Sequence, residues 1–129
     1  MTWSSALLAF LVAHLVGDVL LQTEWQALNK ARGLGDRVGR RALGRHVAIY
    51  TLACVPALVW VGSETDRGRA VALAALIAVP HLLVDDGRLV RAWLREVKHA
   101  PEAARGLTIA VDQSLHVVCL LAVALAAAS

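Results

Sequence analysis

The sequence has no long uninterrupted apolar segment, few charged residues and only two cysteines. The lack of a clean apolar run argues against a simple membrane anchor. Cys54 and Cys119 both lie in apolar stretches and do not form a C-x-x-C pair, so we expect no disulfide or redox role. The N-terminus lacks the basic segment and small-residue cleavage site of a signal peptide, and we interpret it as a membrane span.

The chain has instead a high apolar content, 58% of 129 residues, and a mean hydropathy of +0.61. Soluble chains contain about 45–50% apolar residues. Charged residues make up 18% and are concentrated between the apolar stretches. We therefore predict an all-α polytopic membrane protein, in which residues 1–129 form a single domain. Its four transmembrane helices are expected in a compact bundle, at Ser5–Leu28, Ala42–Val61, Arg69–Leu94 and Leu107–Ala128.

Basic residues are distributed asymmetrically between the connections. The stretches Asn29–Arg45 and Arg88–Arg105 contain 11 of the 13 Lys and Arg residues, whereas the turn Gly62–Gly68 is nearly neutral. With four spans, the two basic connections lie on the same side, and the positive-inside rule predicts that side to be the cytoplasm. We expect a protein of the cytoplasmic (inner) membrane with both termini outside. The net charge of +3 then reflects topology and lipid headgroups, not a nucleic-acid partner.

Three of the predicted spans carry a histidine and an aspartate four residues apart. They are His14 and Asp18, His81 and Asp85, and, in reverse order, Asp112 and His116. This spacing puts both side chains of a pair on one face of a helix. Because the fourth span runs opposite to the first and third, its reversed order predicts one deep layer of histidines and one shallower layer of aspartates. Ionisable groups in a bilayer are costly, so the pairs indicate a functional site.

Three imidazoles and three carboxylates suit one or two divalent metal ions, with Zn, Mn, Fe or Mg as candidates. We predict the six residues of the pairs as ligands. His46 opens the second span at a matching depth and carries Tyr50 one turn further along; we predict catalytic roles for both, with His46 as general acid or base. The predicted substrate-binding residues are Gln22, Arg45, Arg88 and Gln113.

The pattern leaves several functions open. His–Asp pairs also serve as simple polar contacts between helices, at about 0.6 kcal/mol each, but three pairs at matched depth favour a site. The first hypothesis is a membrane-embedded, metal-dependent hydrolase or transferase that acts on a lipid-linked or amphipathic anionic substrate at the cytoplasmic leaflet. The second is a small transporter or channel subunit for protons or a divalent cation, and the third is a structural subunit. The sequence also leaves a homo-oligomer open.

A set of motifs covers nearly the whole chain. It consists of His14-Leu-Val-Gly-Asp18-Val-Leu-Leu-Gln22-Thr-Glu-Trp25 with Asn29-Lys30, His46, His81-Leu-Leu-Val-Asp85 and Asp112-Gln113-Ser-Leu-His116. In these motifs the chain resembles a bacterial domain-of-unknown-function family, number 3307, of small multi-pass membrane proteins. Asp86-Gly87 departs from the aromatic or aliphatic continuation usual there. The family has no established activity, so the resemblance implies the site residues and not a reaction.

The charge asymmetry leads to a first prediction, on topology. In a variant without Cys54 and Cys119, a cysteine at Ser63 or Ser129 should react with an impermeant thiol reagent in intact cells, and a cysteine at Gly35 should not. The positive-inside rule keeps the basic connection that contains Gly35 in the cytoplasm. Labelling at Gly35 would reverse the orientation.

Overall fold

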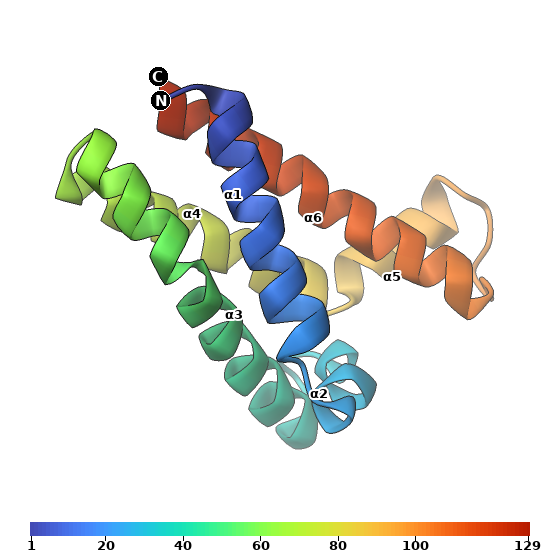
Figure 1. Ribbon diagram of the computed structural model, residues 1–129. Helices are drawn as coiled ribbons and strands as arrows, with labels where there is room; N and C mark the ends of the chain where they lie inside the picture. Colours follow the sequence, from blue (N-terminus) through green and yellow to red (C-terminus); the bar gives the residue numbers. More distant parts are fainter.

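The computed structural model describes residues 1–129, which form helices and connections only (Figure 1). The helices are α1 (Trp3–Leu15), α2 (Glu24–Asn29), α3 (Arg37–Glu64), α4 (Arg67–Asp85), α5 (Arg88–Glu96) and α6 (Arg105–Ala128). A π-helical turn, η1 (Val16–Leu20), continues α1, and a 3-10 turn, η2 (Lys30–Arg32), follows α2. Four helices are long and apolar enough to cross a membrane: α1 with η1, α3, α4 and α6. This confirms the predicted fold class.

The first predicted range, Ser5–Leu28, contains two helices and not one. The helical backbone ends at Leu21, after the π turn, and α2 begins at Glu24 with Thr23 as its N-cap. A reciprocal capping box starts α2. The backbone N–H of Gln26 donates to Thr23 Oγ1, and the backbone N–H of Thr23 donates to the side-chain oxygen of Gln26. The break coincides with the polar residues Gln22, Thr23 and Glu24. Thr23 followed three residues later by Gln26 is the sequence signature of a capping box, which the prediction of a continuous span overlooked.

The third predicted range, Arg69–Leu94, also divides in two. Helix α4 ends at Asp85 and α5 starts at Arg88. Between them Gly87 has a φ of +80°, in the left-handed region that favours glycine. A Cβ at Gly87 would lie 3.0 Å from the carbonyl oxygen of Ala31, so a larger residue would also collide with the segment after α2.

The bundle has two ends of different character (Figure 1). The N- and C-termini lie together at one end, and α2 and α5 lie at the other. The terminal end contains a core of 14 buried residues without a charged side chain, contributed by α1, α3, α4 and α6 and including Phe10, Val61, Ile77 and Val123. The polar residues of the spans gather in the other half.

The π turn that continues α1 packs closely against α3 at Gly17. A Cβ at Gly17 would lie 2.8 Å from Tyr50 Cδ2 and 3.1 Å from Tyr50 Cα, so only glycine fits. The π turn, closed by the Leu21 amide donating to the Val16 carbonyl at 2.9 Å, carries Asp18 at its centre. Such turns occur often at functional sites.

This close approach predicts that Gly17→Ala destabilises the protein by about 1–3 kcal/mol, because the neighbouring Tyr50 backbone cannot move without displacing α3. Gly44→Ala is the matched control, since a Cβ there meets nothing within 4 Å. It should stabilise α3 by up to about 1 kcal/mol. Thermal unfolding in detergent would measure both, and equal behaviour of the two variants would contradict the packing described.

Candidate functional site

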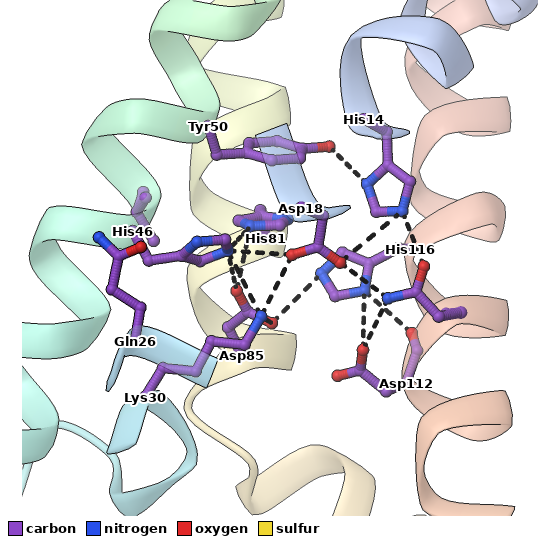
Figure 2. Close-up of polar contacts among 12 residues, drawn as sticks. His14, Asp18, Gln26, Lys30, His46, Tyr50, His81, Asp85, Asp112 and His116 are labelled. Carbon is purple, nitrogen blue, oxygen red and sulfur yellow. Dashed lines mark hydrogen bonds and ion pairs between the residues drawn. The ribbon is translucent and has the colours of Figure 1, made fainter. Parts of the chain in front are cut away.

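Most buried polar side chains of the protein meet at one place between α1, α3, α4 and α6 (Figure 2). They are His14, Asp18, His46, His81, Asp85 and His116, each at most 5% exposed. The partner of His116, Asp112, lies at the edge, with a side chain 21% exposed. The structure thus brings together all three His–Asp pairs that the sequence indicated, and His46 lies among them, at the depth expected from its position in the second span.

Four of these residues direct one donor atom each at a common point. His46 Nε2 lies 3.0 Å from His81 Nε2 and 2.9 Å from Asp85 Oδ2, and His81 Nε2 lies 3.0 Å from the same Asp85 oxygen. Asp18 Oδ1 lies 3.0 Å from His46 Nε2. Ligands at right angles, about 2.1 Å from a metal ion, are about 3.0 Å apart. The four side chains therefore fit adjacent positions around one divalent ion.

Several of these atoms have lone pairs but no hydrogen-bond donor. Both oxygens of Asp85 are buried and accept no well-aligned hydrogen bond, although nitrogens of Lys30, His46 and His81 lie 2.9–3.0 Å away. His116 Nδ1 donates to the carbonyl oxygen of Asp112 at 2.9 Å, so in the neutral ring Nε2 is the unprotonated nitrogen. That Nε2 is buried, has no partner and lies 3.7 Å from Asp85 Oδ1. Buried polar groups are rarely left unpaired, so the cluster is suited to a cation.

The ammonium group of Lys30 reaches the same carboxylates from outside the bundle. Its Nζ lies 2.9 Å from Asp85 Oδ1 and 3.2 Å from Asp18 Oδ1 (Figure 2). Burial lowers the pKa of Lys30, but the carboxylates of Asp85 and Asp18 outweigh that effect and raise this pKa above its ordinary value. Lys30 is therefore a cation at neutral pH and compensates part of the buried negative charge.

Lys30 is positioned by the break after the first span. The capping box of α2 and the 3-10 turn fold residues 24–32 back beneath the bundle, where α2 and η2 pack against α3. Asp86 Oδ2 then accepts from the Leu34 amide at 2.8 Å, and Arg91 Nη1 donates to the Ala31 carbonyl at 3.0 Å. These two bonds fasten the segment to the start of α5.

His14 lies outside the group of four, although we predicted it as a ligand. Its Nδ1 faces Tyr50 Oη at 3.1 Å and its Nε2 faces Gln113 Oε1 at 3.1 Å, so both ring nitrogens have protein partners. The amide of Gln113 donates to Asp18 Oδ2 at 2.8 Å and to Asp112 Oδ2 at 3.0 Å. His14 thus orients Gln113, and Gln113 orients two carboxylates.

A second set of potential ligands, Asp18, Asp112 and His116, shares Asp18 with the first. The side-chain amide of Gln113 already donates hydrogen bonds to both carboxylates of this set, Asp18 and Asp112. We therefore consider the group of His46, His81, Asp85 and Asp18 the better metal site.

Tyr50 separates the cluster from the apolar core. Its ring stacks on His81 with centroids 3.4 Å apart and an interplanar angle of 9°. The side chain is 1% exposed and its hydroxyl faces His14, not a solvent-accessible space. This position suits the support of His81 and His14 better than the catalytic contact predicted from the sequence.

A cavity of about 550 Å³ lies on the other side of the cluster. The three aspartates line it and the histidines do not, so carboxylates face the cavity and imidazoles lie behind them. A groove of similar volume between α3 and α4 is lined mainly by apolar residues and does not include any residue of the cluster.

The predicted substrate-binding residues divide into two groups. Gln22 and Gln113 line the cavity. Arg45 lies 6.0 Å over the Trp25 ring, and Arg88 pairs with Asp86 at 2.8 Å; neither lines the cavity.

Three basic residues that we did not assign to the site line the cavity instead: Lys30, Arg91 and Arg105. All three belong to the connections whose charge we attributed to topology. Only Lys30 carried a signal in the sequence, because it belongs to the family motif quoted above. No periodicity singles out Arg91 or Arg105, since the fold alone brings them to the cavity.

A family model described as "Protein of unknown function (DUF3307)" matches residues 6–129, which confirms the resemblance noted from the motifs. The match includes every residue of the cluster and of the cavity lining. Comparisons with curated proteins and with solved structures find no match.

The position of Lys30 predicts that Lys30→Met destabilises chelator-treated protein by about 3–5 kcal/mol, because it leaves buried carboxylates without their cation. Lys98→Met, at an exposed lysine of the connection after α5, is the control and should change stability little. Thermal unfolding in detergent gives both values. If both variants lost only a small and similar amount of stability, the Lys30 ammonium would not compensate the charges of Asp18 and Asp85.

Proposed function

Since the chain belongs to the DUF3307 family of unknown function, we propose its activity from its site: a membrane-embedded, metal-dependent hydrolase or transferase. Its substrate is a lipid-linked or amphipathic molecule with an anionic group. The observation that carries this proposal is the convergence of His46, His81, Asp85 and Asp18. Their ligand atoms all lie within 4.8 Å of one another, and four of the six pairs are 2.9–3.0 Å apart. The buried Nε2 of His116, which has no hydrogen-bond partner, supports it further.

In this proposal the metal ligands are His46, His81, Asp85 and Asp18, and His116 Nε2 is directed at the same place. Compared with the six ligands predicted from the sequence, this set adds His46 and omits His14, Asp112 and His116. His14 is omitted because both of its ring nitrogens already have protein partners. Two imidazoles favour Zn, Mn or Fe over Mg. When bound, such an ion polarises a phosphoryl or carbonyl oxygen, or lowers the pKa of a water molecule.

Asp112 is the residue best placed to exchange a proton with the substrate. It lines the cavity, its side chain is the most exposed of the three aspartates, and it is not one of the four proposed ligands. Gln113 fixes the carboxylate by donating to Oδ2 at 3.0 Å. A general base needs an accessible lone pair next to the reacting group, which Asp112 offers and the buried His46 does not.

The proposed substrate enters from the basic end of the bundle. Lys30, Arg91 and Arg105 line the cavity there, and the positive-inside rule assigns this end to the cytoplasm. In this orientation the protein lies in the inner membrane with both termini outside, and the substrate comes from the cytoplasmic leaflet. Basic residues at the entrance attract anionic groups.

Closure of the opposite half supports an enzyme rather than a transporter of protons or divalent cations. Between the cluster and the terminal end lies the core of 14 buried residues, which includes Tyr50 and has no charged side chain. A translocation path needs polar groups or water along its length. A core without charged side chains supplies none within the single chain.

The proposal predicts different outcomes for four substitutions, read as metal content by elemental analysis and as turnover. Asp85→Asn and His46→Ala should each lose most of the bound metal, because they remove proposed ligands. His14→Ala should retain it, since both nitrogens of His14 bond to other residues. Asp112→Asn should retain the metal and lose about 10²–10⁴-fold in turnover, the usual contribution of a general base.

Turnover is measured by mass spectrometry of a membrane lipid extract incubated with the metal-loaded protein. Retention of metal by Asp85→Asn would contradict the metal site. Full activity in Asp112→Asn would contradict its role as base. Metal binding by the wild type without any change in the lipids would leave the ion structural and the enzyme proposal wrong.

A further inference from the structure

The cavity combines three kinds of lining that together define a type of ligand. Its inner wall carries the carboxylates of Asp18, Asp85 and Asp112. Lys30, Arg91 and Arg105 also line the cavity, and much of the remaining lining is apolar, including Val19, Val84, Val90 and Ile109. A ligand that satisfies all three has a group that bridges a metal and cations, and an apolar chain.

The two arginines are available for such a group. Neither Arg91 nor Arg105 lies within ion-pair distance of a carboxylate, whereas Arg88 pairs with Asp86. Arg91 uses one N–H to donate to the Ala31 carbonyl at 3.0 Å, which anchors its guanidinium at the cavity. Each guanidinium carries five N–H donors, so most of those of Arg91 remain free.

The charge pattern favours phosphate over carboxylate. A phosphate group is tetrahedral, so its oxygens can face arginines on one side of the cavity and the metal site on the other. The two oxygens of a carboxylate lie in one plane and point the same way. Arginine is the residue that proteins use most for bidentate recognition of phosphate, and divalent metals commonly accompany it in phosphoryl chemistry.

The apolar wall favours a lipid over a soluble phosphate. Val19, from η1, and Ile109, from α6, line the cavity and are 60% and 50% exposed on the outside of the bundle. Both belong to segments long and apolar enough to cross a membrane. The cavity wall is therefore continuous with the apolar outer surface, and an acyl chain can lie along it while the phosphate stays inside.

We infer that the cavity binds the phosphate group of a phospholipid-type amphiphile, held by Arg91 and Arg105, with its chain along Val19 and Ile109. The inference rests on the proposed function in that the same phosphate faces the proposed metal ligands. Lys30, which pairs with Asp18 and Asp85, belongs to the floor of this site and not to the pair that selects phosphate.

Binding of dioctanoyl phosphatidic acid to the purified protein in a neutral detergent, measured by calorimetry, tests the inference. Arg91→Gln and Arg105→Gln should each weaken binding about tenfold or more, because each removes charge-assisted hydrogen bonds to the phosphate. Arg45→Gln and Arg88→Gln are matched controls, since these arginines lie outside the cavity, and they should bind as the wild type does.

Three further ligands separate the alternatives. Dioctanoylglycerol has the chains without phosphate, inorganic phosphate lacks the chains, and decanoate replaces phosphate by carboxylate; all three should bind at least tenfold more weakly than phosphatidic acid. Equal binding of dioctanoylglycerol or decanoate would overturn phosphate recognition. Equal binding of inorganic phosphate would overturn the lipid. Equal losses in the control variants would reveal general charge attraction only.

Metal content distinguishes failure of this inference from failure of the proposed function. Both Arg91→Gln and Arg105→Gln should retain the metal. Arg105→Gln should also keep the thermal stability of the wild type, whereas Arg91→Gln loses the hydrogen bond to Ala31 and some stability with it. A wild-type protein that binds metal but not phosphatidic acid contradicts the inference alone. A protein that binds phosphatidic acid through Arg91 and Arg105 but holds no metal contradicts the metal enzyme and leaves the phosphate site standing.

Discussion

The placement of carboxylates inside an apolar bundle is the constraint on which this structure depends. An ion removed from water costs several kcal/mol even after relaxation, unless opposite charge and hydrogen bonds compensate it. Asp18 and Asp85 are almost fully buried, and Lys30 and Gln113 supply the compensation that the protein itself provides. The break after η1, the capping box of α2 and the turn η2 serve to bring Lys30 to the carboxylates.

The two halves of the bundle differ in the side chains that they bury. The terminal half is an apolar core that holds the four long helices together, and the other half carries the buried polar cluster. Tyr50 marks the boundary, because it belongs to the core cluster and also stacks on His81. Glycine at position 17 lets α1 approach Tyr50 closely enough for the site to form. A stable half of this kind can offset the cost of buried polar atoms without a hydrogen-bond partner in the other half, such as His116 Nε2.

The sequence predicted which residues would meet more reliably than it predicted their roles. The spacing of four between His and Asp, and its reversal in Asp112 and His116, follow from helix geometry and brought three pairs to one place. The roles of His14 and His46 depend on what their ring nitrogens contact. His14 bonds to Tyr50 and Gln113, whereas His46 Nε2 faces three other potential ligands. Those neighbours come from other helices, so no pattern within one helix could assign them.

By itself, the sequence determined an all-α chain with four helices of membrane-spanning length, because apolar content and helix length act locally along the chain. It also determined a shared depth for the His–Asp pairs, because helix periodicity and alternating direction follow from the order of the spans. The breaks at Leu21 and Gly87 have local causes, the capping box of Thr23 and Gln26 and the positive φ of Gly87. Only the tertiary structure decided that Lys30, Arg91 and Arg105 reach the cavity and that His46, not His14, joins the group of four. Those results depend on contacts between segments that are distant in the sequence. Such contacts exist only after the helices have packed, so a pattern within one segment does not predict them.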